Sequence, residues 1–179
     1  MIYEKILIGG FILKKINKVI VAFIFFFQLV LLTSCSNLAY EPKIKMDIIV
    51  RELTKNEYSA VGTKGLSTPS IQDFKKIVFD FEMKNSNQIT YRNINIPEHA
   101  IWKYRINSID GDRYWFGNGY KMGDSSTYHK EFVYYSKGVS EEQVRKAFED
   151  MLVRISFQTK DGKSRTLEYS IGNYIEFKK

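Results

Sequence analysis

Alternating hydrophobic and polar residues run through most of the chain after residue 43 and predict β-strands. In residues 44–50 and 77–83 every second side chain is hydrophobic, the pattern of a strand that buries one face. In residues 100–108 the predicted inward face holds Trp102, Tyr104 and Ile106. The full set of further predicted strands is 89–97, 100–108, 127–136, 153–157 and 167–171.

One stretch predicts a helix instead. Ser140 and Gln143 have the spacing of a capping box, which favours a helix over residues 141–151. The hydrophobic residues on one face of this helix are Val144, Ala147, Phe148 and Met151. Residues 57–73 are rich in Gly, Ser and Thr and predict a loop, and Lys-Asp-Gly-Lys at 160–163 predicts a hairpin turn.

This order of elements predicts one all-β domain over residues 46–179, a sandwich of seven or eight strands with one short helix. It resembles the immunoglobulin-like sandwich seen in many small bacterial lipoproteins. The resemblance is one of pattern, without a family-specific motif, and covers most of residues 46–177. Trp102 lies where such folds often keep a core tryptophan, but the cysteine pair of antibody domains is absent.

The start of the chain has the features of a secretory signal peptide. A cluster of lysines at positions 14, 15 and 18 precedes an apolar run from Val19 to Leu32, interrupted only by Gln28. As a helix this run spans about 21 Å, which is short for a hydrocarbon core of about 30 Å. The alternative is a membrane anchor, because residues 6–13 add apolar length before the lysines.

The only cysteine of the chain follows this apolar run directly. Leu32-Thr33-Ser34-Cys35 resembles the bacterial lipobox, an aliphatic residue and two small residues before a cysteine. The resemblance implies cleavage between Ser34 and Cys35 and attachment of diacylglycerol to the thiol, as in palmitoylated bacterial lipoproteins. The alternative is a buried, inert cysteine, a common state of the free residue.

These features predict a signal peptide at residues 1–34 and a polar tether at 35–45. The two acyl chains of a diacylglycerol give stable membrane attachment, where a single chain is marginal. We therefore expect the protein on the exported face of a cell membrane, or on the periplasmic face of an outer membrane if the cell has one. The domain itself is expected to lie in water.

Charge adds little to this picture. The chain carries a formal net charge of +7, and cleavage after Ser34 removes four lysines and one glutamate, which leaves +4. The basic residues are interspersed with acidic ones and form no dense stripe, so we expect no nucleic-acid partner. The excess of positive charge would serve attraction to anionic lipid or to a cell-wall polymer, or simply solubility.

The sequence contains no phosphate-binding loop, no dinucleotide fingerprint and no metalloprotease or nucleophile-elbow motif. His99 and His129 would need a carboxylate such as Glu98 or Glu131 to form a zinc site, and solvated histidines are the simpler interpretation. Clustered acidic oxygens suit calcium, but the spacing of the three candidates fits no calcium loop: Asp110, Asp112 and Asp124. We expect no metal, no cofactor and no enzymatic activity.

The one segment that suggests binding is residues 113–123. Tyr114, Trp115 and Tyr120 lie among three glycines there, and aromatic side chains in loops stack on sugars or contact partner proteins. The alternative is that alternate residues point into the core. We therefore predict a non-enzymatic binding module for a protein or envelope polymer, the alternative being a cell-envelope hydrolase or its accessory or inhibitor. The sequence does not indicate the oligomeric state.

Overall fold

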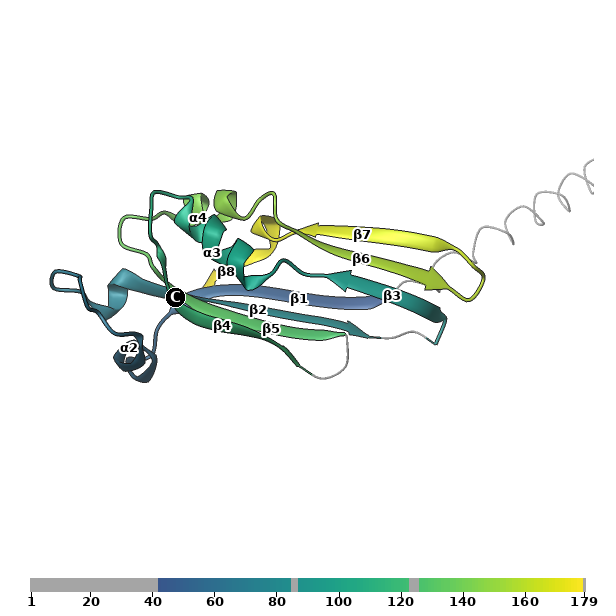
Figure 1. The fold of residues 1–179 in the computed structure, drawn as a ribbon, viewed down its shortest axis with the longest axis horizontal. Coiled ribbons are helices and arrows are strands. Elements are labelled where there is room, and N and C mark those ends of the chain that lie inside the picture. Colours follow the sequence, from purple (N-terminus) through teal and green to yellow (C-terminus); the bar gives the residue numbers. More distant parts are fainter. Residues whose placement is uncertain (1–41, 85–86, 123–125, 179) are drawn as a thin grey trace, which may run out of the picture. The chain divides into compact units, whose positions relative to one another are not determined.

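The computed structural model describes residues 42–84, 87–122 and 126–178, with the side chains of 118–122 left out. Two packed β-sheets form the fold (Figure 1). The large sheet has the order β4-β5-β2-β1-β8, from β1 (Lys43–Glu52), β2 (Phe74–Lys84), β4 (Tyr114–Met122), β5 (Thr127–Tyr135) and β8 (Ile175–Lys178). The small sheet has the order β3-β6-β7, from β3 (Ile89–Asn95), β6 (Leu152–Thr159) and β7 (Ser164–Ser170). The predicted all-β sandwich is confirmed.

The main core lies between the two sheets. Strands β1 and β2 pair antiparallel and turn alternate side chains inward, so that Ile48, Phe79 and Phe81 are almost fully buried. Val153 and Phe157 of β6 meet them from the small sheet and are also buried. The inward faces predicted for residues 77–83 and 153–157 are therefore the observed ones. Hairpin pairing of β6 with β7 around residues 160–163 also agrees with the prediction.

The described residues contain three helices rather than the one predicted: α2 (Lys55–Val61), α3 (His99–Asn107) and α4 (Glu141–Ala147). Helix α4 has the predicted capping box of Ser140 and Gln143 but ends four residues earlier than expected. Helix α2 occupies part of the predicted loop and begins with its own capping box, in which Thr54 and Glu57 cap each other's backbone N–H groups.

The predicted strand at 100–108 is wrong, because these residues form α3. Trp102 and Ile106 are fully buried, whereas Tyr104 between them is 67% exposed. Residues four apart share a face of a helix, and residues two apart do not. The indole N–H of Trp102 donates to the carbonyl of Pro97 at 3.0 Å, which fastens the start of α3. Trp102 thus fills the core from a helix.

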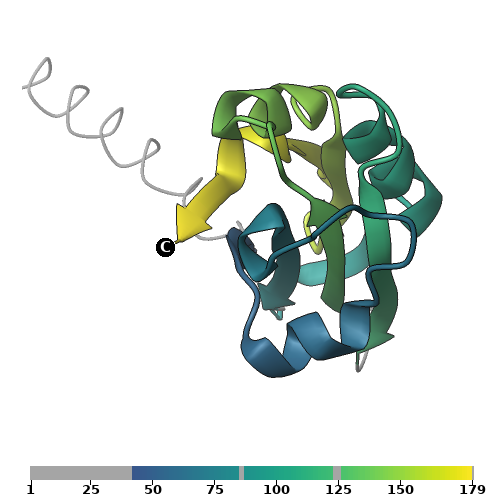
Figure 2. The same cartoon turned by 90° about the vertical axis from the view of Figure 1, so that its left-hand side faces the viewer.

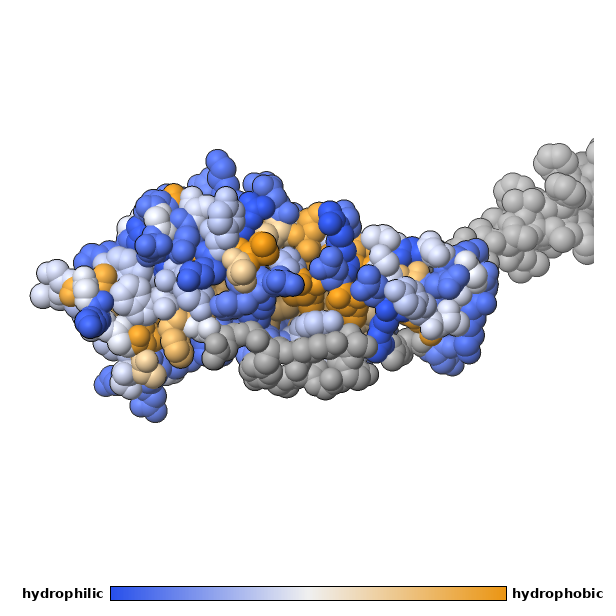
Figure 3. Space-filling view, in the orientation of Figure 1, coloured by the Kyte–Doolittle hydropathy of each residue, from blue (hydrophilic) through white to orange (hydrophobic). Residues whose placement is uncertain are grey.

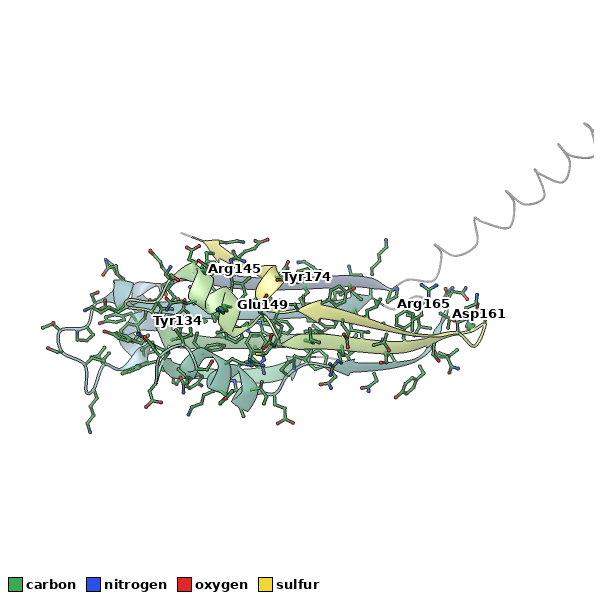
Figure 4. All side chains as sticks on the ribbon, turned by 90° about the horizontal axis from the view of Figure 1, so that it is seen from above. Tyr134, Arg145, Glu149, Asp161, Arg165 and Tyr174 are labelled. Atoms are coloured by element: carbon green, nitrogen blue, oxygen red, sulfur yellow. The ribbon has the colours of Figure 1, made fainter. Side chains whose placement is uncertain are left out.

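The two ends of the sandwich differ in construction. We call the end that holds Pro42, Gln88, Ser126 and the β6–β7 hairpin at 160–163 the turn end. These segments are neighbours there, because Met83 N–H donates to the Ser126 carbonyl at 2.9 Å and Lys160 N–H to the Gln88 carbonyl at 2.8 Å. Asp161 of the hairpin is labelled at this end in Figure 4.

We call the opposite end, which holds α2, α3, α4 and residues 62–73, the helix end. Figure 2 looks onto it and shows α3 and α4 on one side of the large sheet, with α2 on the other. A second, smaller core lies under α2, where Leu53, Phe74 and Val133 are buried against partly buried Tyr58. The helix end therefore covers both faces of the large sheet, whereas the small sheet covers one.

Candidate functional site

The aromatic segment predicted to bind a partner is an edge strand, β4, rather than a loop. Its pairing with β5 shifts register between Tyr114 and Phe116, so that Trp115 is the extra residue of a bulge. Tyr114 packs against the main core and Trp115 against the second core. Tyr120 lies opposite His129 in the pairing with β5, and its side chain is outside the described part. Tyr114 and Trp115 thus do not share one patch.

Trp115 holds the helix end together. Its ring contacts Phe74 edge-on, with 5.5 Å between centroids, and its indole N–H donates to the carbonyl of Gly62 at 2.8 Å. Tyr58 completes this attachment by donating its hydroxyl to the Pro69 carbonyl at 3.0 Å. These contacts fix α2 and the segment after it on the large sheet.

Tyr114 belongs to a polar cluster beneath α3. Its hydroxyl donates to the Gly117 carbonyl at 2.8 Å and lies 2.9 Å from Nε2 of His99. The imidazole therefore donates through Nε2, and its Nδ1 is buried without a hydrogen-bond partner. Burial, with the charge of Lys130 as a lesser cause, lowers the pKa of His99. A neutral histidine fits this environment.

Lys130 is the most perturbed cation of this cluster. Its ammonium donates to the Pro97 carbonyl at 3.0 Å and lies 5.4 Å from the centre of the Trp102 ring. Burial lowers the pKa of Lys130 to about 8, although the nearby charge of Glu98 opposes this. The sequence did not indicate that Lys130 points toward the core. That orientation depends on which strands pair with β5, and the pairing was not predicted.

A chain of charged side chains crosses the outer face of the large sheet. Both carboxylate oxygens of Glu57 accept from the Arg51 guanidinium, at 2.6 and 2.8 Å, and Lys76 lies 3.0 Å from the same carboxylate. Lys76 also contacts Glu131 at 2.6 Å. The Arg51 guanidinium, above all, holds the pKa of Glu57 far below its usual range. The ion pairs tie α2 to β1, β2 and β5.

The chain of charges continues to His129, farther along the outer face. Its Nδ1 lies 2.6 Å from a carboxylate oxygen of Asp80, and its Nε2 lies 3.7 Å from one of Glu131. The short contact between Nδ1 and Asp80 fixes the orientation of the imidazole on the outer face.

Next to His129 the outer face has a pocket of about 210 Å³. Its ionisable lining residues are Lys45, Asp47, Asp80, Glu82 and His129, and Thr127 contributes a hydroxyl. Lys45 and Asp47 are 3.0 Å apart and exposed, so their pairing is weak. The pocket offers both acidic and basic groups to a polar ligand. The alternating charges of β1 and β2 were visible in the sequence, but their gathering depends on strand register.

The two histidines of the zinc candidate do not come together. His99 lies in α3 and faces the core, whereas His129 lies on the outer face of the large sheet. Asp110 forms a salt bridge with Arg113, at 2.5 Å, and Asp124 lies outside the described residues. In the described part of the chain, no three His, Cys, Asp or Glu side chains are grouped to hold a metal ion.

Phe116 is the exposed aromatic residue of this segment that the sequence analysis did not choose. It is 52% exposed and lies opposite Val133 of the second core. Without the bulge in β4, Phe116 would lie on the same face as Tyr114. The bulge moves Phe116 to the outer face, which a sequence pattern alone does not show. Phe116 and the pocket beside His129 both belong to the outer face of the large sheet, and together they define the candidate binding surface.

Cys35 and the predicted signal peptide lie outside the described residues. Among residues 42–84, 87–122 and 126–178, no helix is long and apolar enough to cross a membrane. Comparisons of the chain with protein-family models, with curated proteins and with solved structures gave no match.

Proposed function

We propose that this protein is an exported lipoprotein, anchored through Cys35, whose immunoglobulin-like domain binds another protein or an envelope polymer without catalysis. The observation that carries the proposal is the distance along the chain between two features. The lipobox-like Leu32-Thr33-Ser34-Cys35 ends at residue 35, and a compact unit begins at Pro42. A lipid-anchored domain on a short tether has this organisation.

The strand order supports the immunoglobulin-like classification. In constant-type immunoglobulin domains the first, second, fifth and fourth strands form one sheet and the third, sixth and seventh the other. Here the large sheet contains β1, β2, β5 and β4 in that adjacency, and the small sheet contains β3, β6 and β7. The additions are the helices α2, α3 and α4 in the connections between strands, and β8, which pairs parallel to β1.

Binding rather than catalysis is supported by the pairing of charges on the outer face. Lys76 pairs with both Glu57 and Glu131 at distances of 3.0 Å or less, and Arg51 pairs with Glu57. Catalytic carboxylates and bases instead have protonation states tuned for proton transfer. An exposed sheet face with one aromatic residue and a polar pocket is suited to contact with a larger partner.

The anchor is tested by Cys35→Ala in a bacterium that makes the full chain. We expect the wild type to incorporate a fatty-acid analogue and to be shortened at residue 35. The Cys35→Ala variant should incorporate none and keep its full length, because the thiol is the site of acylation. Asn37→Ala, two residues away, serves as the control and should be labelled normally. Normal labelling of Cys35→Ala would disprove the anchor.

A further inference from the structure

The turn end is the part of the domain that a lipid anchor would hold nearest to the membrane. Seven residues, 35–41, separate the start of the predicted mature chain from Pro42. Fully extended, they reach at most about 25 Å. Strand β1 then runs away from Pro42 for 10 residues, or about 33 Å, before the chain reaches α2. An anchored domain therefore keeps its turn end close to the lipid headgroups.

Basic side chains gather at this same end. Lys43 and Lys84 lie at the ends of β1 and β2, and Lys160, Lys163 and Arg165 belong to the β6–β7 hairpin and the start of β7. Both Arg165 and Asp161 are labelled at the turn end in Figure 4. Asp161, the acidic residue of the hairpin, pairs with Lys163 at 2.9 Å. In Figure 3 this end of the domain is largely hydrophilic.

The strand register adds an independent sign that an anionic partner belongs here. Lys43 and Lys84 are directly opposite each other in the antiparallel pairing of β1 and β2, and both are exposed. Like charges at such opposed positions destabilise a sheet. Among the described residues, Lys84 pairs with Glu82 at 3.9 Å, a weak contact between exposed groups. An anionic surface would relieve this repulsion.

We propose that the turn end is a membrane-docking surface that binds anionic phospholipid headgroups through Lys43, Lys84 and the basic residues of the β6–β7 hairpin. The inference rests on the anchoring proposed above, since the tether selects the end that meets the lipid. Docking places the helix end, with α2 and the second core, away from the membrane. Each basic residue near an anionic leaflet strengthens partitioning about fivefold.

The test uses the chain from residue 36, which carries no lipid, so that its binding reports the surface alone. Both core clusters lie within residues 48–175, and this chain retains them. It is mixed with vesicles of phosphatidylcholine, with or without phosphatidylglycerol, and bound protein is measured by sedimentation. We expect binding to the anionic vesicles only, decreasing at high salt as screening shortens the range of the charges.

Two variants with the same change in net charge locate the surface. Lys43→Glu/Lys84→Glu/Lys160→Glu alters the turn end, and Lys55→Glu/Lys64→Glu/Lys178→Glu alters exposed lysines elsewhere in the domain. We expect the first variant to bind at least about a hundredfold less than the wild type, because three favourable lysines become repelling glutamates, and the second to keep most of its binding. Thermal unfolding of both confirms that the fold is intact, and Lys→Gln versions replace any variant that unfolds.

Several outcomes would overturn the assignment. An equal loss in both variants would show that net charge, not the turn end, governs binding. If the wild type does not bind anionic vesicles, the turn end is not a membrane-docking surface. If it binds soluble poly(glycerol phosphate) more strongly than vesicles, the turn end binds wall polymer instead of lipid. None of these results depends on acylation of Cys35, which the labelling of Cys35→Ala reports separately.

Discussion

The turn end and the helix end are built from the same strands, but the connections between strands differ in length at the two ends. At the turn end β6 and β7 are joined by the tight turn at residues 160–163. At the helix end the connections are long, with residues 53–73 between β1 and β2 and residues 136–151 between β5 and β6. The extra chain there forms α2, α4 and the second core.

The difference suits the two binding roles proposed for this domain. Short connections with exposed lysines give the turn end a simple charged surface, which is sufficient for a flat anionic partner. The helix end has its own buried residues and a network of ion pairs, and these fix the shape of a more elaborate surface. We expect specific recognition on the outer face, through Phe116 and the pocket beside His129, and nonspecific attraction at the turn end.

The largest expected effect is the loss of Phe81, which lies in the main core between the sheets. Phe81→Ala should lower the free energy of unfolding by about 3–5 kcal/mol, because the ring is 1% exposed. Phe74→Ala, in the second core, should mainly loosen the packing of residues 53–73 on the sheet. Urea unfolding measures the loss of stability in Phe81→Ala, and hydrogen exchange measures the local opening in Phe74→Ala. A loss below about 1 kcal/mol for Phe81→Ala would show that the main core does not depend on this ring.

A smaller effect is expected at Glu57, which ties α2 to the sheet. Glu57→Gln should cost about 1–2 kcal/mol at neutral pH, because a charged acceptor is lost from three partners. Glu82→Gln is the matched control toward the turn end and should cost almost nothing, since its contact with Lys84 is 3.9 Å long and exposed. Equal costs would contradict the contrast between the two ends.

The sign of the pH dependence follows from the pKa of Glu57, which is lower in the folded chain than the usual value of about 4.3. Its stabilisation is fully present above the usual value and is lost as the pH falls toward the folded pKa. The stability of the wild type should therefore approach that of Glu57→Gln in acid. Urea unfolding of both proteins across the acidic range measures this convergence.

The smallest effect on stability is expected for two exposed aromatic residues, Phe116 near the second core and Tyr91 in β3. Phe116→Ala and Tyr91→Ala should each shift the melting temperature little, because exposed side chains contribute little to packing. Only Phe116→Ala should weaken capture of a partner by the cell-bound protein, measured by cross-linking. Equal capture by both variants would remove Phe116 from the binding surface.

Most strands of this fold were predictable because a buried sheet face requires alternation, as in residues 77–83. Helix α3 was not, because Trp102 and Ile106 satisfy both a period of two and a spacing of four residues, and only packing decides between them. Residues 57–61 were predicted as part of a loop at 57–73, but the capping box at Thr54 and the ion pairs of Glu57 with β1 and β2 hold them in α2.

The candidate site was predictable only in part. Tyr114 and Trp115 were chosen for their residue type, but a β-bulge sends them to different cores. The charged groups of the outer face come together through register, for example Asp80 opposite His129, and no single segment contains that information. Conversely, the anchoring cysteine is proposed from the sequence alone.

Strand β8 gives the domain a mechanical property. It runs parallel to β1, pairing Ile48 with Ile175 and Arg51 with Lys178. In such a pair, a force that pulls the start of β1 and the end of β8 apart loads all of the inter-strand hydrogen bonds together, in shear, instead of opening them one after another. With the anchor proposed at Cys35, a partner bound near the end of β8 would load the β1–β8 pair in this way, and the domain would transmit the tension before it unfolded.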